Sequence, residues 1–224
     1  MADGPPDRDE AARRRMVSQQ IRARGVRDEA VLAALAKVPR HEFVPGEVRG
    51  SAYDDHPLPI GLGQTISQPY IVALMSEALA PRPSHRLLEL GTGSGYQAAV
   101  LSLLVASVFT IEYHAALAEE AAARLSRLGY ANVEVRAGDG WGGWPARAPF
   151  EAAIVTFAAP DVPAALVAQV RTGGRICIPI GQPQQVQQLM LYTKRADGAL
   201  SSRMLGAVRF VPVQGERDGG AGGG

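Results

Sequence analysis

Short apolar segments alternate along most of the chain with longer segments in which apolar residues recur every three or four positions. The short segments are typical of buried strands, and the longer ones are typical of amphipathic helices. Strands that alternate with helices predict βαβ units and therefore a parallel sheet. The predicted strands cover residues 86–90, 108–111, 133–136, 152–156 and 175–180, and the predicted helices cover residues 10–24, 70–79, 96–105, 114–128 and 162–170, with one further helix that starts after Asp28.

Local signals mark several of these helix boundaries. Asp28 suits an N-cap, and Pro39 ends the helix that follows it. Gly25 and Gly129 each follow a helical segment and suit the left-handed cap that glycine adopts without steric cost. The helices before the first strand of the sheet are therefore predicted to be short and well delimited.

Two regions depart from the alternation of strands and helices. Residues 39–69 are rich in proline and show no sustained period, so they predict an ordered loop region. Residues 186–194 and 205–213 alternate in polarity on either side of Asp197–Gly198, which predicts an antiparallel hairpin at the sheet edge. The loop region carries too much apolar surface for a disordered linker, so we expect it to pack over a functional site. Its apolar residues are Phe43, Val44, Tyr53, Leu58, Ile60 and Ile66.

Composition narrows the class of protein without indicating a reaction. The 224 residues carry 23 Lys and Arg against 22 Asp and Glu, a balance that gives no charge excess to attract nucleic acid or an anionic membrane. The single cysteine, Cys177, cannot form an internal disulfide, and the four histidines show no metal-ligand spacing. No apolar run reaches the roughly 18 residues of a membrane span, and the N-terminus lacks the apolar core of a signal peptide. We therefore expect a cytoplasmic protein that has no metal, nucleic-acid or membrane partner and is monomeric by default.

The expected boundaries enclose one α/β domain at residues 10–214. Residues 10–80 are predicted to supply N-terminal helices and a substrate loop, and residues 81–214 a doubly wound, Rossmann-like sheet. That sheet is mostly parallel and ends in the antiparallel hairpin. Residues 1–9 and the glycine-rich residues 215–224 are expected to be disordered.

The strongest chemical signal is a glycine loop at residues 91–95. An apolar strand runs into Gly91-Thr92-Gly93-Ser94-Gly95, and a helix follows. Glycines let the backbone turn sharply and let a ligand approach it closely, beside the N-terminus of a helix. Three alternating glycines exceed what a tight turn requires, so the pattern favours a ligand site over a purely structural turn.

The glycines alone leave two ligands open. Gly93-x-Gly95-x-x-Ala98 formally satisfies the dinucleotide pattern, whereas the compact spacing from Gly91 suits a smaller adenosyl ligand without a pyrophosphate. Glu112 ends the next predicted strand, where a carboxylate accepts hydrogen bonds from the ribose hydroxyls of either ligand. Asp139 follows the third strand, where an acidic group can meet an adenine amine, although Asp-Gly is also a common turn.

Longer motifs resolve this choice by resemblance. LLELGTGSGYQAAVL, FTIE, GDGWGGW, and FEAAIVTFAAPDVPAAL followed by GGRICIPIG resemble the successive motifs of class I S-adenosylmethionine methyltransferases. With GQTISQP, VPRHEFVP and VRFVPV, they resemble more narrowly the protein-L-isoaspartate O-methyltransferases. The similarity runs from about residue 16 to residue 213, which is nearly the whole of the predicted domain.

The resemblance implies a methyltransferase sheet, S-adenosylmethionine as the cofactor, S-adenosylhomocysteine as its product, and a role for particular residues. The glycine loop residues Gly91, Thr92, Gly93 and Gly95 would line the methionine and ribose part of the cofactor. Glu112 would hold the ribose hydroxyls, and Asp139 and Gly140 would face the adenine. Thr65, Ile66 and Ser67 would form a roof near the sulfonium, with Ser67 as the catalytic residue. Ser67 also lies just before a predicted helix, so a role as N-cap alone remains open at this point.

The implied reaction is the methylation of the free carboxylate of L-isoaspartyl residues in damaged proteins, which starts their repair through a succinimide. A carboxylate is already ionised at neutral pH, so it needs no general base. Activity on D-aspartyl residues is a further possibility of the same family. Three alternatives stay open: methylation of a normal aspartate in a specific peptide, a nicotinamide-dependent oxidoreductase, and a cofactor-binding module without activity.

Two positions depart from the family pattern. Val213-Gln214-Gly215 stands where some relatives have a threonine, so a substrate contact from that side chain is not expected. Phe157 replaces a small residue, and we expect it to narrow the substrate cleft.

Overall fold

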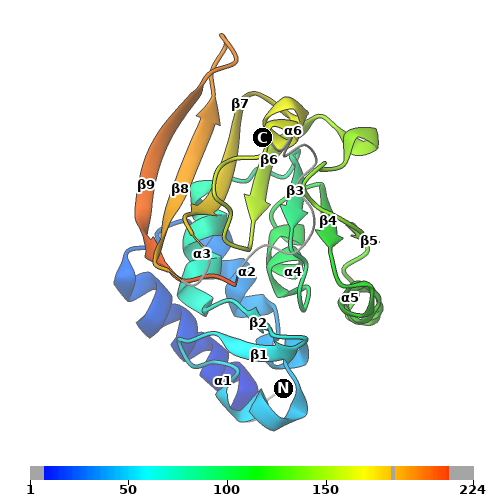
Figure 1. Cartoon of the computed structure of the whole chain (residues 1–224). Helices are drawn as coiled ribbons and strands as arrows, with labels where there is room; N and C mark the ends of the chain where they lie inside the picture. Colours follow the sequence, from blue (N-terminus) through cyan, green and yellow to red (C-terminus); the bar gives the residue numbers. More distant parts are fainter. Residues whose placement is uncertain (1–7, 183–184, 212–224) are drawn as a thin grey trace.

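A computed structural model describes residues 8–182 and 185–211. Within this part of the chain, seven strands form one sheet in the order β5-β4-β3-β6-β7-β8-β9 (Figure 1). The pairs from β5 to β7 are parallel, and β8 and β9 pair in antiparallel fashion. The strands are β3 (Arg86–Leu90), β4 (Ser107–Glu112), β5 (Val133–Ala137), β6 (Phe150–Val155), β7 (Val170–Ile180), β8 (Gln187–Lys194) and β9 (Leu200–Val208).

The doubly wound α/β sheet predicted from the sequence is thus confirmed, with five parallel strands and an antiparallel pair at one edge. The chain winds outward from β3 to β5 and then returns to place β6 on the other side of β3. Ligands of such sheets bind where the strand order reverses, beyond the carboxyl ends of the strands. The site is therefore expected between the ends of β3 and β6.

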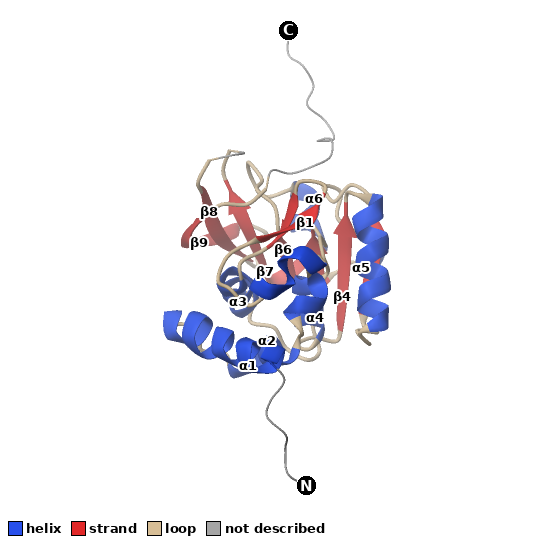
Figure 2. Ribbon diagram, turned by 90° about the horizontal axis from the view of Figure 1, so that it is seen from below, coloured by secondary structure: helices blue, strands red, loops and turns tan. Residues whose placement is uncertain are grey.

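Alternating side chains divide the sheet into two apolar faces. Leu87 on β3 belongs to a cluster that includes residues of helices α2 to α4, whereas its neighbour Leu88 belongs to a cluster that includes Leu166 of α6 and Trp144. Both faces are covered because parallel strands must bury both sides. Helix α5 lies alongside β4 (Figure 2). The helices are α1 (Arg8–Arg15), α2 (Glu29–Lys37), α3 (Pro69–Ala78), α4 (Tyr96–Ser102), α5 (Ala115–Arg127) and α6 (Ala164–Gln169).

The first predicted helix is continuous but changes its pitch. Helix α1 passes into a π-helical segment at Met16–Ile21 and a 3₁₀ turn at Arg22–Arg24. Gly25 ends it with φ of 102°, the left-handed cap expected from the sequence. The Asp28 side chain accepts hydrogen bonds from the N–H groups of Ala30 and Val31, which confirms the N-cap of α2. Helix α1 begins at Arg8, inside the stretch 1–9 that was expected to be disordered; residues 1–7 and 215–224 lie outside the described residues.

The loop region at 39–69 contains structure that its lack of period did not predict. Two 3₁₀ segments, Arg40–Phe43 and Gly46–Ser51, precede a small antiparallel hairpin of β1 (Leu58–Gly61) and β2 (Gln64–Ile66). This hairpin lies towards the carboxyl ends of the parallel strands (Figure 1). The apolar residues Phe43, Tyr53 and Ile66 are buried there, as expected of a loop that packs over a site.

A buried arginine fixes this region to the rest of the fold. The Arg40 Nε donates a hydrogen bond to the carbonyl of Ala52 at 2.8 Å, and its guanidinium lies 4.9 Å from the centre of the Tyr96 ring in α4. Burial lowers the pKa of Arg40 to about 10. The loop region is thereby attached to the helix that follows the glycine loop.

The C-terminal hairpin is confirmed, but the predicted bounds of its second strand were wrong. Strand β9 starts at Leu200, directly after the turn at Asp197–Gly198, and the strand ends at Val208 rather than at residue 213. The prediction missed the start because β9 is an edge strand, in which residues 201–204 are all exposed and show no alternation. The turn closes with a hydrogen bond from Arg195 N to the Ala199 carbonyl at 2.8 Å. None of the described helices is both long enough and apolar enough to span a bilayer.

Candidate active site

The glycine loop lies at the reversal of strand order, between the ends of β3 and β6. Its three glycines all have positive φ, 95° at Gly91, 52° at Gly93 and 88° at Gly95, a region that other residues rarely adopt. At Gly91 a side chain is also excluded by space, because a Cβ there would lie 2.4 Å from the Thr156 Oγ1. A Cβ at Gly93 would lie 3.3 Å from Ile60 of β1. The loop therefore presents bare backbone to its surroundings.

Glu112 connects the end of β4 to this loop. It is buried, and its Oε2 accepts a hydrogen bond from the backbone N–H of Gly93 at 2.8 Å, while its Oε1 accepts one from the backbone N–H of His114 at 3.0 Å. Each carboxylate oxygen keeps a further lone pair, since an ionised carboxylate has about four acceptor positions. The geometry suits a group that holds two neighbouring hydroxyls beside the glycine loop.

Beneath the loop, β3 carries a buried acid that the sequence reading did not single out. Neither carboxylate oxygen of Glu89 has a hydrogen-bond partner of good geometry among the described residues. Burial raises the pKa of Glu89 to about 8. The hydroxyl of Thr110 on the neighbouring strand lowers this pKa, but by less than burial raises it. The Thr110 hydroxyl forms a hydrogen bond with the hydroxyl of Thr92 in the loop, with 2.6 Å between the two oxygens. The carboxyl group is therefore largely protonated at neutral pH in the structure as it stands.

The predicted roof residues lie opposite the glycine loop. Thr65, Ile66 and Ser67 line one small pocket together with Gly91, Thr92 and Gly93. Thr65 also lines an adjoining pocket with Glu112 and Gly140. Because β1 and β2 place these residues against the loop, the structure brings together most of the residues singled out from the sequence.

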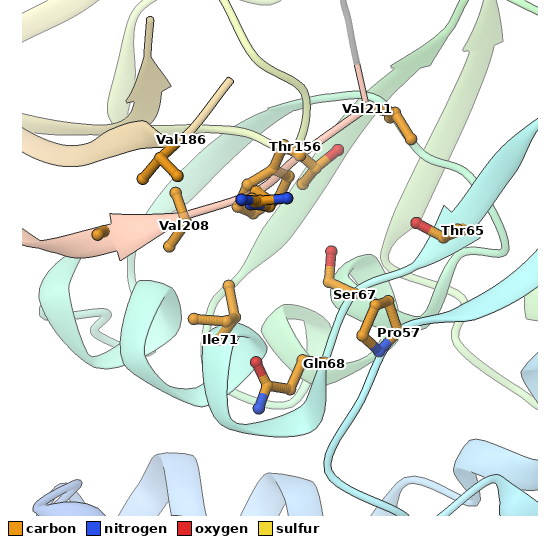
Figure 3. A pocket seen from close by; sticks show the side chains of 12 residues that line it. Pro57, Thr65, Ser67, Gln68, Ile71, Thr156, Val186, Val208 and Val211 are labelled. Atoms are coloured by element: carbon orange, nitrogen blue, oxygen red, sulfur yellow. The ribbon is translucent and has the colours of Figure 1, made fainter. Parts of the chain in front are cut away.

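Ser67 is not the N-cap of α3. The N-cap position belongs to Gln68, and Pro69 is the first helical residue. Within the described part of the chain, the Ser67 hydroxyl has no hydrogen-bond partner, and Figure 3 shows it pointing into a cavity. The alternative that Ser67 acts only as a cap is therefore wrong.

The cavity beside Ser67 has a volume of about 610 Å³. It is bounded by the loop region on one side and by the end of β9 on the other, so two segments far apart in the sequence form its walls (Figure 3). Ser67 lines both this cavity and the pocket of the glycine loop, and so stands where the two meet. The cavity is lined by Pro57, Thr65, Ser67, Gln68, Ile71, Thr156, Val186, Ala207, Val208, Arg209, Phe210 and Val211.

The cavity has a distinct electrostatic character. Arg209 is the one charged residue among those that line it, and it has no ion-pair partner within residues 8–182 and 185–211. The lining includes no carboxylate. An anionic substrate group therefore meets no like charge among the lining residues and one opposite charge.

Sequence reasoning missed Thr156, which lines the cavity and both smaller pockets. It follows β6, and its hydroxyl donates a hydrogen bond to the carbonyl of Gly91 at 2.6 Å. The available signal was its position, because the residue after the strand next to β3 lies at the reversal of strand order. Thr156 fixes the first turn of the glycine loop.

Three predicted residues lie differently from the expectation. Asp139 is exposed and its Oδ1 accepts a hydrogen bond from the N–H of Trp141 at 2.9 Å, so it closes a turn, and only its neighbour Gly140 lines a pocket. Gly95 packs against Leu125 of α5 rather than lining either pocket. Phe157 lines the pocket beside Gly91 and not the larger cavity, so it narrows the pocket of the glycine loop rather than the cavity beside Ser67. The departure at Gln214 lies outside the described residues.

Comparisons with known proteins agree with this geometry. The family model of protein-L-isoaspartate(D-aspartate) O-methyltransferase matches residues 11–218. A protein-L-isoaspartate O-methyltransferase of Methylorubrum extorquens is 55% identical over 208 residues, which are 93% of this chain and 90% of the relative. Protein-L-isoaspartate O-methyltransferase 2 of a Polaromonas species is 53% identical over 190 residues, which are 85% of this chain and 90% of the relative.

Solved structures agree as well. A protein-L-isoaspartate O-methyltransferase superposes with a TM-score of 0.82 at 30% identity over 90% of this chain and 66% of that chain. A second structure, from Plasmodium falciparum and solved with S-adenosyl-L-homocysteine, shares the fold with a TM-score of 0.76 at 22% identity, over 90% of this chain and 98% of that one. By sequence and by fold, the chain belongs to the protein-L-isoaspartate(D-aspartate) O-methyltransferase family.

Proposed function

We propose that this protein transfers the methyl group of S-adenosyl-L-methionine to the free carboxylate of L-isoaspartyl residues in proteins and peptides. The observation that carries the proposal is the unengaged hydroxyl of Ser67, at the junction of a glycine-loop pocket and an open cavity without carboxylates. Family membership supplies the reaction, and the geometry supports a division of the site into a cofactor side and a substrate side.

The residues of the cofactor side fit an adenosyl amino-acid ligand. The backbone cradle has no room for a side chain at Gly91, and at Gly93 a Cβ would be in tight contact with Ile60. Beside this cradle, Glu112 offers free lone pairs for two ribose hydroxyls. The buried, unpartnered Glu89 lies below the loop, where an ammonium group would favour its ionised form. When bound, the cofactor supplies a methyl group activated by a sulfonium charge.

On the substrate side, the protein needs little chemical machinery. An isoaspartyl carboxylate is ionised at neutral pH, so no residue has to remove a proton from it. The Ser67 hydroxyl donates one hydrogen bond to a carboxylate oxygen and leaves the other oxygen directed at the glycine-loop pocket. Such alignment of two reactants contributes up to about 7–11 kcal/mol to a reaction barrier. No further protein group is needed after this step. A backbone nitrogen of the substrate attacks the ester carbonyl, methanol leaves and a succinimide forms. Water then opens the succinimide, in part to normal aspartate.

A matched set of peptides tests the proposal. One sequence is prepared with L-isoaspartate, D-aspartate or L-aspartate at the same position and incubated with S-adenosylmethionine that carries a radioactive methyl group. We expect base-labile label on the L-isoaspartyl peptide, while the D-aspartyl peptide tests the wider specificity in the family name. Label on the L-aspartyl peptide would favour methylation of normal aspartate, and cofactor binding without any label would favour a binding module.

The proposed setting is the cytoplasm, with the protein as a monomer that acts on many damaged chains. The composition supports a wide range of clients, because a net charge of +1 favours neither acidic nor basic proteins. Light scattering of the purified protein measures the oligomeric state, and cell fractionation measures the location.

A further inference from the structure

Helix α3 begins without a cap of its own. The N-cap residue Gln68 makes no side-chain hydrogen bond to the helix, and Pro69 has no N–H, so the first N–H in need of a partner is that of Tyr70. The Oδ1 of Asp55 accepts a hydrogen bond from this N–H at 3.3 Å. A carboxylate is also the favoured charge at a helix N-terminus. Asp55 thus caps α3 from a separate part of the loop region.

The same residue holds the side chain next to the catalytic position. The Gln68 Nε2 donates hydrogen bonds to the Oδ2 of Asp55 at 2.8 Å and to its backbone carbonyl at 2.9 Å. Figure 3 shows Gln68 pointing away from the Ser67 hydroxyl, which faces the cavity. Because the two residues are adjacent in the chain, fixing Gln68 and the start of α3 also fixes the backbone from which Ser67 projects.

The charge of Asp55 is neutralised by Arg24, a residue that does not line the cavity. Arg24 pairs with its Oδ2, and the Arg24 guanidinium lies 3.5 Å from the centre of the Tyr70 ring. Asp55 is not among the residues that line the cavity. A substrate carboxylate beside Ser67 is therefore not opposed by an unpaired negative charge at Asp55.

We propose that Asp55 is a positioning residue for methyl transfer. Asp55 caps α3 and holds Gln68 in place. A serine just before a helix often caps it with its own hydroxyl. Because Asp55 caps α3 instead, the Ser67 hydroxyl stays free for the substrate carboxylate. The inference rests on the proposed function of Ser67. Asp55 touches neither substrate nor cofactor and acts only through the placement of Ser67.

Asp55→Asn is the sharpest change, because it keeps the shape of the side chain. An asparagine oxygen still accepts from the Tyr70 N–H, but its amide group then faces the Gln68 amide, donor against donor. We expect kcat on an L-isoaspartyl peptide to fall about tenfold, with the dissociation constant of S-adenosylmethionine within twofold of the parent value. Arg24→Met is the matched control, since it removes the ion pair, keeps an apolar stem over Tyr70 and leaves the clamp intact. Its kcat should stay within twofold, and only the KM for the peptide should rise, because the charge of Asp55 is then unpaired.

The decisive readout is the effect of Asp55→Asn in a Ser67→Ala background. If Asp55 acts through the Ser67 hydroxyl, the second change costs nothing further in kcat, whereas a general structural role gives the same fold-loss in both backgrounds. An equal loss in both backgrounds, an unchanged kcat for Asp55→Asn alone, or an equal loss for Arg24→Met overturns the inference. If Asp55→Asn does not fold, Gln68→Leu breaks the clamp from the other side, and the same comparison with Ser67→Ala applies.

These outcomes separate the two proposals. Full turnover by Ser67→Ala overturns the role of Ser67 and the inference that rests on it. Impaired turnover by Ser67→Ala, with an additive effect of Asp55→Asn, leaves the proposed function in place and removes only the positioning role.

Discussion

The two sides of the site are built in different ways. On the proposed cofactor side, the glycine loop follows β3 and Glu112 ends the neighbouring strand β4, and backbone geometry does most of the shaping. On the substrate side, the cavity is enclosed by residues 57–71 and 186–211, with Thr156 between them, and side chains from these distant segments form its walls. A site shaped by rigid local backbone suits a cofactor, because the cofactor is the same molecule in every reaction. Walls from distant segments suit clients that share only one damaged residue.

This contrast implies that damage to each side should change a different measured constant. Changes at the glycine loop should alter the dissociation constant of the cofactor, and changes at the cavity should alter turnover of the peptide. Four predictions, in order of decreasing effect, test how far the two sides are independent and whether the buried carboxyl group of Glu89 is protonated.

Gly91→Ala should weaken S-adenosylmethionine binding by a hundredfold or more. A left-handed backbone costs a residue other than glycine of the order of 1–3 kcal/mol, and at Gly91 the added Cβ would also lie 2.4 Å from the Thr156 Oγ1. Gly129→Ala is the control, because its φ is 82° but a Cβ there has nothing within 4 Å. Isothermal titration of the cofactor measures both variants. Equal affinities for the two would show that the loop does not need a bare backbone.

Ser67→Ala should lower kcat on an L-isoaspartyl peptide roughly ten- to a hundredfold, because a hydrogen bond to a charged group contributes about 1.5–3 kcal/mol. The cofactor dissociation constant should stay nearly unchanged. Glu112→Ala should show the opposite pattern, with weaker cofactor binding. Steady-state kinetics and titration of both variants measure this pair, and a Ser67→Ala protein with weakened cofactor binding would contradict the division of the site.

Glu89→Gln should change how stability depends on pH. The pKa of Glu89 is about 8 in the fold against an ordinary 4.5, so between these values the folded state retains a proton that the unfolded state has lost. The group's contribution is complete below about pH 4.5 and is lost as pH rises through 8. The free energy of unfolding of Glu89→Gln should therefore exceed that of the parent by up to a few kcal/mol at pH 9 and approach it at pH 4.5. Urea unfolding at several pH values measures the difference, and a constant gap would refute the raised pKa.

Arg209→Gln should raise the KM for an L-isoaspartyl peptide only a few-fold, since Arg209 is exposed and its field is screened by salt. The effect should shrink as salt concentration increases. Lys194→Gln offers a control, as it removes a cation that is hydrogen-bonded to the carbonyls of Val167 and Val170 away from the cavity. A KM for Arg209→Gln that equals the parent value at low salt would show that the cavity charge is not used.

The contrast also explains what the sequence revealed. The sheet, the glycine loop and Glu112 were predictable because each depends on residues that are close together in the chain. The β1–β2 hairpin, Thr156 and Arg209 were not, because their roles depend on which segments meet in space. The early start of β9 was missed because β9 is itself an edge strand and exposes several consecutive side chains, which removes the alternation of apolar and polar residues. Glu89 was missed because the sequence of an apolar strand does not show whether a carboxylate within it has a hydrogen-bond partner.

The turn between β8 and β9 bears on the ageing of the protein itself. A succinimide forms in a chain when the nitrogen after an aspartate attacks that aspartate's side chain, and glycine offers the least hindrance to this attack. Here the N–H of Gly198 donates to the carbonyl of Arg195 at 3.0 Å, while the Asp197 Oδ1 accepts from Ala199 at 2.9 Å. The two groups that would react, the nitrogen of Gly198 and the carboxylate of Asp197, are therefore both held in other hydrogen bonds. We therefore expect succinimide formation to be slow at this turn of the hairpin, whose strands carry one wall of the cavity.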